Sequence, residues 1–170
     1  NRQFQAVMSL KGKILNTWEV DTDAVTQSQE VKDIAMALGL EPGCRTLENF
    51  RSGKICILAD ADTDGAHIAT LICALFLKHF RPLVEAGHVF IAQPPLFRID
   101  QGKEVFYALD EDEKEKIVKQ LNSKNKQKKI EIQRFKGLGE MNPSQLRETT
   151  MELDGRRLLK LTLEKGNTST

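Results

Sequence analysis

The sequence is poor in aromatic residues and cysteine, and its charges almost cancel. Only 6% of its 170 residues are aromatic, including one tyrosine and one tryptophan. The three cysteines, Cys44, Cys56 and Cys73, are odd in number and widely spaced, so they match no zinc or disulfide pattern and favour a reducing cytoplasm. Because the formal net charge is only +1, any binding of nucleic acid must come from local basic patches.

Long apolar runs are also lacking. No run approaches the roughly 18 residues of a membrane span, and no basic-then-apolar leader opens the chain, so we expect neither a span nor a signal peptide. The 40% hydrophobic content is enough for a core, and the length suits one domain or one domain with a small appendage. Residues 1–7 are typical of a helix end without a start signal, so we expect the chain to be part of a longer polypeptide.

The middle of the chain has the pattern of an α/β fold. Residues 54–59 and 88–92 are short apolar runs that predict buried strands, and residues 66–80 between them predict an apolar core helix. Pro82 helps to end that helix. A strand–helix–strand order predicts a right-handed crossover and a parallel sheet.

The flanking segments predict further elements. Residues 28–39 carry apolar residues at helical spacing and end in a glycine stop signal. Residues 97–107 predict a hairpin that turns at Gln101-Gly102-Lys103. A charged helix and loop is expected at 110–129, and a less regular unit at 130–165.

Three aspartates follow the first predicted strand, in the segment Asp60-Ala61-Asp62-Thr63-Asp64-Gly65. Extended residues two apart point the same way, so we expect the three carboxylates to converge. Two unit charges about 4 Å apart repel by roughly 4 kcal/mol at an effective dielectric near 20, which favours a bound cation. Ligand sites of parallel α/β sheets also lie at the carboxyl ends of strands.

This acidic segment allows four interpretations. A calcium-binding EF-hand loop is rejected, because the glutamate it needs at the twelfth position is replaced by Leu71 and a strand precedes the loop. A solvated acidic turn and a haloacid-dehalogenase-like phosphatase stay open; in the phosphatase Asp60 would be the nucleophile and Asp62 the acid, although Asp64 stands where a small neutral residue is usual. A magnesium site for phosphodiester chemistry fits best, since Mg²⁺ prefers a few carboxylates with waters and a substrate phosphate.

The basic segments differ in character. The lysines of residues 114–129 follow or share a helix with Glu111, Glu113 and Glu115, which indicates a solvated, salt-bridged helix face. Lys11-Gly12-Lys13 and Arg134-Phe135-Lys136-Gly137 contain glycines, which let the backbone and lysines approach a phosphate closely. From its position His67 can be an ordinary helix-start residue, and His79 and His88 are expected to be structural.

Several ordered motifs resemble one known family. The segments that carry the resemblance are GKILN at 12–16, SQEVKDIA at 28–35, LADADTDGAHI at 58–68, QPPLFRID at 93–100 and RFKGLGEMNPSQLRETTM at 134–151. They resemble the Toprim region of the B subunits of bacterial type IIA topoisomerases, and the topoisomerase IV form more than the gyrase form, because no large insertion precedes RFKGLGEMN. Ser9, where the family usually has a proline, and residues 151–157 depart from the pattern.

The resemblance implies a fold and roles for particular residues. It implies a Rossmann-like Toprim parallel sheet flanked by helices over residues 1–110, and a linker helix with a small α+β tail unit over 111–170. Asp60 and Asp62 would be magnesium ligands, with Asp64 completing the acidic motif. DNA contacts are expected, from the resemblance and the basic segments together, at Lys11, Lys13, Asn16, His67, Arg134 and Lys136.

The resemblance also implies an activity and partners. The chain would be the cleavage core of an ATP-dependent type II topoisomerase, an A2B2 heterotetramer in which the A subunit supplies the DNA-attacking tyrosine. Tyr107, the only tyrosine, is therefore expected to be a packing residue. We expect a further metal-binding glutamate to lie upstream of Asn1, the ATP site to lie in the full-length subunit outside this fragment, and this fragment alone to be inactive. A gyrase B fragment, the phosphatase, and a noncatalytic scaffold that binds the A subunit and DNA are the alternatives.

Overall fold

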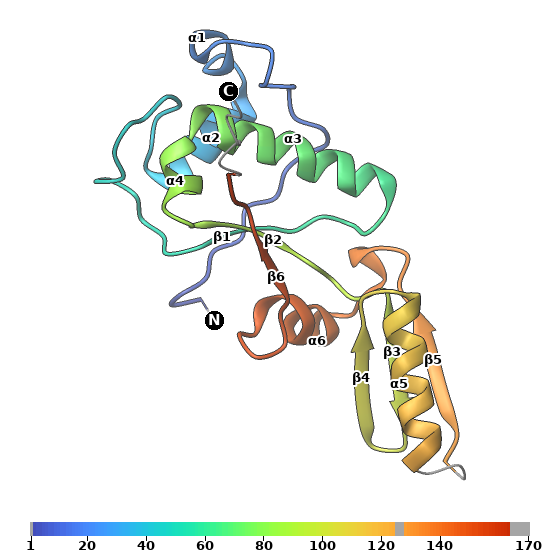
Figure 1. Ribbon diagram of the computed structural model, residues 1–170. Helices are drawn as coiled ribbons and strands as arrows, with labels where there is room; N and C mark the ends of the chain where they lie inside the picture. Colours follow the sequence, from blue (N-terminus) through green and yellow to red (C-terminus); the bar gives the residue numbers. More distant parts are fainter. Residues whose placement is uncertain (1, 125–127, 164–170) are drawn as a thin grey trace, which may run out of the picture. The chain divides into compact units, whose positions relative to one another are not determined.

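The computed structural model describes residues 2–124 and 128–163, and Figure 1 shows their arrangement. Parts of the predicted lysine-rich loop and of the predicted tail unit, residues 125–127 and 164–170, lie outside the described residues. By their contacts the described residues form two compact units. The first comprises residues 2–55, 67–89 and 161–163, and the second comprises residues 56–66, 90–124 and 128–160. The boundary expected between residues 110 and 111 stays a prediction.

The first unit is mainly helical. Helix α2 (Gln29–Leu38) begins where the Ser28 hydroxyl accepts a hydrogen bond from the Val31 amide, and it ends at Gly39, whose φ of 74° is left-handed. The predicted start, stop and buried face of this helix are therefore confirmed. Helix α1 (Thr22–Val25) is a single turn capped by the Asp21 carboxylate.

Helix α3 (Thr63–His79) runs from the acidic segment to the first unit's core. It begins three residues before the predicted start at 66, so it includes Asp64. Its buried residues, among them Leu75 and Phe76, confirm the predicted core helix. Helix α4 (Arg81–Glu85) follows directly, with Pro82 in its first turn, where a missing N–H costs nothing. No helix of the described part of the chain is long and apolar enough to span a bilayer.

One three-stranded sheet has the order β1-β2-β6, with β1 at Ile55–Ile57, β2 at Val89–Ala92 and β6 at Leu158–Lys160. The predicted order of strand, helix and strand is confirmed, since α3 and α4 lie between β1 and β2 in the sequence. Two details differ from the prediction. The sheet is not purely parallel, because β6 pairs with β2 in antiparallel direction, with Leu159 opposite Ile91. The expected full burial of the first strand is wrong, because Cys56 is exposed.

The second sheet is antiparallel, in the order β4-β3-β5, and carries helix α5 (Glu111–Lys124). Strands β3 (Phe97–Gln101) and β4 (Glu104–Ala108) form the predicted hairpin, and Gly102 provides its left-handed turn residue with a φ of 66°. Strand β5 (Ile130–Arg134) pairs with the other side of β3. The core beneath α5 consists of Phe97, Ile99, Ala108 and Leu121.

The segment after β5 holds three short helical turns. A 3-10 turn, η1 (Leu138–Glu140), precedes α6 (Pro143–Leu146), and a π-helical turn, η2 (Arg147–Met151), follows it. Helix α6 starts with a capping box: the Asn142 side chain accepts from the Gln145 amide, and the Gln145 side chain accepts from the Asn142 amide. This cap fixes the path of the chain just after η1.

Candidate metal centre

The acidic segment occupies the turn from β1 into α3. Asp60 lies in the loop, Asp62 immediately precedes the helix, and Asp64 lies in its first turn. The Asp62 carboxylate accepts a hydrogen bond from the Gly65 amide at 2.7 Å, as a helix N-cap does. One Asp62 oxygen is therefore fixed by the helix that the segment itself begins.

The expectation that three carboxylates converge is wrong for this conformation. Within the described part of the chain, no group of three or more histidine, cysteine, aspartate or glutamate side chains is arranged to hold a metal ion. The expectation assumed an extended segment, but β1 ends at Ile57 and the helix begins at Thr63. Residues two apart on a helix or its cap do not share a face, so Asp62 and Asp64 do not point the same way as they would in a strand.

Asp60 is bound by a loop 78 residues later in the sequence, which we call the glycine loop (residues 136–140). The Leu138 amide donates a hydrogen bond to Asp60 Oδ1 at 2.7 Å. A Cβ atom built on Gly137 would stand 3.1 Å from Asp60 Cγ and Oδ1, so the loop backbone rests directly on the carboxylate. The sequence predicted a phosphate as the neighbour of these glycines; in the structure, the neighbour of Gly137 is an aspartate.

Gly65 is required for a different close approach. A Cβ atom there would stand 2.0 Å from the Asp60 carbonyl oxygen, which is backbone and cannot rotate away. The sixth position of the acidic segment therefore accepts only glycine without a shift of the main chain. Together, Gly65, Gly137 and the Leu138 amide fix both the backbone and the side chain of Asp60.

The donor set suits Mg²⁺. Asp60 and Asp62 each use Oδ1 in a hydrogen bond, and Oδ2 of each accepts none from the residues that the structure describes. Magnesium is commonly held by one or two carboxylates, with waters and substrate phosphates completing its octahedral shell. Both aspartates are exposed, so water and a phosphate can reach them.

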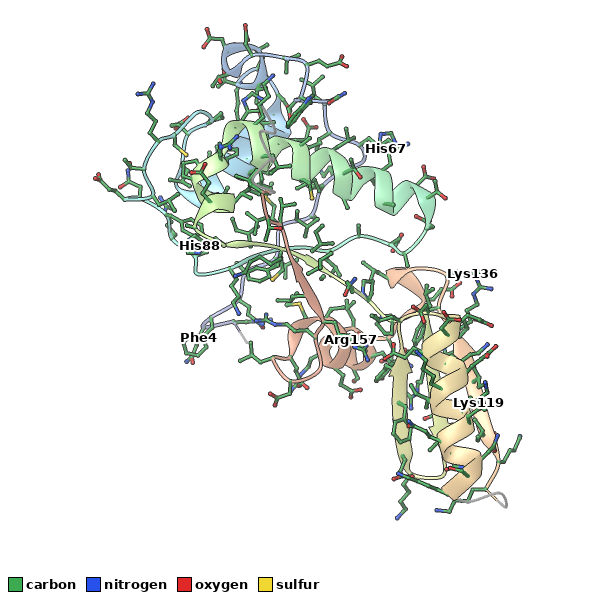
Figure 2. The ribbon with its side chains drawn as sticks, in the orientation of Figure 1. Phe4, His67, His88, Lys119, Lys136 and Arg157 are labelled. Atoms are coloured by element: carbon green, nitrogen blue, oxygen red, sulfur yellow. The ribbon has the colours of Figure 1, made fainter. Side chains whose placement is uncertain are left out.

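The predicted DNA contacts of the second unit are Lys136, the first residue of the glycine loop, and Arg134, two residues before the loop. Lys136 is exposed, and its backbone amide donates to Glu140 Oε2 at 2.7 Å, which closes the loop on itself. Figure 2 shows the Lys136 side chain extending away from the ribbon. Arg134 is exposed at the end of β5, with its guanidinium carbon 6.0 Å from the centre of the Phe97 ring.

The remaining predicted DNA contacts belong to the first unit. Lys11, Lys13, Asn16 and His67 are all exposed there, and their role in binding DNA stays a prediction. Gly12 has a φ of 90°, and nothing lies within 4 Å of where its Cβ would stand. Glycine is therefore favoured at position 12 by the left-handed backbone conformation, and not by a lack of space for a side chain.

Side chains at the end of α3 form hydrogen bonds with residues 17–20, which follow these basic residues. His79 is buried and its Nε2 is 2.8 Å from the Thr17 carbonyl oxygen. Lys78 Nζ donates to the carbonyl oxygens of Trp18 and Val20, the latter at 2.8 Å. These contacts were not evident from the sequence, because a lysine and a histidine at a helix end have no specific pattern.

Two other predictions concern residues away from the acidic segment. The Tyr107 hydroxyl donates to Glu148 Oε2 at 3.1 Å, and burial, reinforced by that hydrogen bond, raises the pKa of Tyr107. Such a tyrosine is poorly suited to act as a nucleophile. On α5, Lys119 is exposed and pairs with Glu115, as a solvated helix face would be (Figure 2).

These features define an α/β protein with an acidic segment between a strand and a helix. The chain belongs to the Toprim domain family, which matches residues 1–94, more than half of its length. Residues 127–170 match the carboxyl terminus of the DNA gyrase B subunit. The family resemblance inferred from the motifs is thereby confirmed.

Comparison with known relatives agrees with the greater resemblance to topoisomerase IV than to gyrase. The chain is 63% identical over 164 residues to the B subunit of DNA topoisomerase 4 of Pseudomonas aeruginosa and, over the same length, to that of Escherichia coli; each match covers 96% of this chain. It is 48% identical over 165 residues to the B subunit of DNA gyrase of Halalkalibacterium halodurans, again over 96% of this chain. The chain spans about a quarter of the length of these relatives, 26% for the first.

Proposed function

We propose that this chain is the magnesium-binding part of the DNA-cleavage core of a type II topoisomerase B subunit, of the topoisomerase IV kind. The observation that carries the proposal is the hydrogen bonding of Asp60 and Asp62. Each carboxylate accepts a hydrogen bond from a backbone amide through Oδ1, which leaves Oδ2 available to a cation. High identity to proteins named as the B subunit of DNA topoisomerase 4 supports it. The cytoplasm is the proposed location, since the substrate would be chromosomal DNA.

Mg²⁺, when bound, would stabilise negative charge on the oxygens of the phosphate at the break. Asp60 and Asp62 would hold the ion, and the Leu138 amide would keep the Asp60 carboxylate in one orientation. Lys136 and Arg134 would bind the DNA backbone near the same loop, as Lys11, Lys13, Asn16 and His67 would elsewhere. Asp64, in the first turn of α3, would complete the acidic motif by adding a negative charge near the cation.

The nucleophile would come from a partner. Tyr107 is the only tyrosine, and its hydroxyl is engaged by Glu148. We therefore assign the attacking tyrosine to an A subunit in an A2B2 assembly, and ATP binding to another part of the B subunit. The enzyme would break both strands of one duplex, pass a second duplex and reseal the break.

The proposal is tested by Asp60→Ala in the full-length B subunit, assayed with the A subunit, Mg²⁺ and ATP on catenated DNA. Removing this ligand should abolish cleavage and unlinking. Asp112→Ala, which removes an exposed carboxylate in the first turn of α5, is the matched control and should leave both intact.

Each rival has its own signature in these assays. Unlinking that survives Asp60→Ala would refute the metal assignment and leave the chain as a scaffold for DNA and the A subunit. Release of phosphate from a small phosphomonoester that depends on Asp60 would instead support the phosphatase.

A further inference from the structure

The contact between the glycine loop and Asp60 is specific in its chemistry. The Leu138 amide has a carboxylate as its acceptor, at 2.7 Å, rather than a backbone carbonyl. A hydrogen bond to a charged group is stronger than one between neutral groups. Because Asp60 is exposed, its side chain would otherwise rotate freely.

Gly137 is a glycine because of Asp60 and not because of its own backbone. Its φ of −169° and ψ of 176° are extended values that any residue adopts. The three atoms nearest to a Cβ at this position all belong to the Asp60 carboxylate, at 3.1 Å for Cγ and Oδ1 and 3.3 Å for Oδ2. Gly139, two residues later, has nothing within 4 Å of its would-be Cβ.

The glycine loop is itself firmly held. Phe135, just before it, is 1% exposed, and its amide donates to the Leu96 carbonyl oxygen at 2.8 Å. Met141, just after it, is buried, and Glu140 accepts from the Lys136 amide. The loop can therefore present the Leu138 amide in a fixed place without help from a ligand.

We propose that Gly137 and the Leu138 amide are positioning groups for the metal site: they fix the rotation of the Asp60 carboxylate so that Oδ2 is presented to the cation. This inference rests on the proposed function, because it takes Asp60 as a metal ligand. It assigns Gly137 and Leu138 a part in metal binding, in addition to any contact of Lys136 with DNA. Groups that orient a metal ligand typically affect metal affinity by about 10–100-fold when they are changed.

The test measures Mn²⁺ affinity of the full-length B subunit, by electron paramagnetic resonance of the free ion. Gly137→Ala should weaken Mn²⁺ binding by about tenfold, since the added methyl pushes the carboxylate away from the Leu138 amide. Gly139→Ala, with the same change of residue in open space, should bind Mn²⁺ as the unchanged protein does. Thermal unfolding shows whether both variants are folded.

Leu138→Pro gives a second, independent variant. It deletes the amide donor at the first residue of η1, where proline is tolerated, after an extended residue that proline also tolerates. It should weaken Mn²⁺ binding to a similar degree, even if Gly137→Ala proves unfolded. Normal affinity in a folded Gly137→Ala or Leu138→Pro variant would overturn the inference.

Asp60→Ala separates this inference from the proposed function. If Asp60→Ala leaves Mn²⁺ affinity unchanged, both the proposed metal site and the inference fail. If Asp60→Ala abolishes binding while the two loop variants bind normally, only the inference fails. Both outcomes are read from Mn²⁺ affinity alone, without a measurement of activity.

Discussion

The acidic segment of the second unit and the basic segment of the first (residues 11–16) are fastened in different ways. The acidic segment is held by backbone amides from Gly65 and Leu138, and by glycines whose main chains leave no room for a side chain. The basic segment is followed by carbonyl groups that accept hydrogen bonds from two side chains, Lys78 and His79. Main-chain amides and close glycine approaches hold the acidic segment. The basic segment combines one such amide, Trp18 N–H to Asn16 Oδ1 at 3.2 Å, with side chains that bind carbonyl oxygens beyond its end.

This difference suits the two proposed roles. A metal ligand must be held within a fraction of an ångström of its productive position, which backbone donors on a closed loop can do. A lysine that binds a phosphate acts as a flexible point charge and tolerates movement. We therefore expect changes in the acidic segment to be severe and local, and changes around the basic segment to be smaller and spread over DNA affinity.

The largest effect is expected from Gly65→Ala. The added methyl would stand 2.0 Å from the Asp60 carbonyl oxygen, so the main chain must move. Overpacking of this kind costs about 1–3 kcal/mol or more in the free energy of unfolding, and here it would also displace Asp60. Denaturant unfolding and Mn²⁺ affinity of the full-length B subunit measure the two consequences. Gly53→Ala, which has open space around its would-be Cβ, is the control, and equal behaviour of the two variants would contradict the close approach.

A moderate effect is expected at His79. His79→Leu leaves the buried Thr17 carbonyl oxygen without its donor, which costs about 1–3 kcal/mol of unfolding free energy. His79→Gln retains a side-chain N–H donor and should recover much of the loss. DNA affinity should fall in His79→Leu, whereas Mn²⁺ affinity should not.

Comparing DNA affinity with Mn²⁺ affinity distinguishes the interactions that hold the basic segment from those that hold the acidic segment. A His79→Leu variant that loses Mn²⁺ binding but keeps DNA affinity would reverse the comparison. Equal loss in His79→Leu and His79→Gln would show that packing of the ring, and not the hydrogen bond to Thr17, holds the segment.

The smallest effect on stability is expected from an ion pair between two side chains of the second unit. Arg157 donates two hydrogen bonds to Glu113, at 2.7 and 3.0 Å, and these chiefly lower the pKa of Glu113 from its ordinary 4.5. A carboxyl whose pKa is lowered by folding stabilises the protein fully above its unfolded pKa. That stabilisation is lost as the pH falls through the lowered folded value.

Arg157→Gln should therefore reduce the unfolding free energy at neutral pH by at most about 1 kcal/mol, because both side chains are partly exposed. The difference from the unchanged protein should shrink as the pH falls below 4.5. Denaturant unfolding at a series of pH values measures it. A difference that stays constant, or grows in acid, would show that the ion pair is not its source.

The sequence predicted those elements whose signals are local. Helix α2 was predicted from its apolar spacing and its stop signal, because Gly39 acts on its own neighbours. The β3–β4 hairpin followed likewise from Gly102 at its turn. Strand β6 was missed, because three residues are too few to show a periodic pattern and they pair with β2 only through tertiary contacts.

The acidic segment shows the same limit. The spacing of the aspartates predicted a metal site, which stays a prediction, but the assumption of an extended backbone gave the wrong geometry. The start of α3 at Thr63, stabilised by the Asp62 cap, decides where Asp64 lies. The partnership of Asp60 with Leu138 spans 78 residues, and nothing local to either residue announces it.

The most direct test of the proposed metal site is anomalous diffraction from crystals of the complete enzyme with DNA, soaked in Mn²⁺ in place of Mg²⁺. We predict a manganese peak at coordinating distance, about 2.0–2.6 Å, from Asp60 Oδ2, while Asp60 Oδ1 remains bonded to the Leu138 amide. A complex with DNA in place and no peak at Asp60 would contradict the assignment of the acidic segment as the metal site.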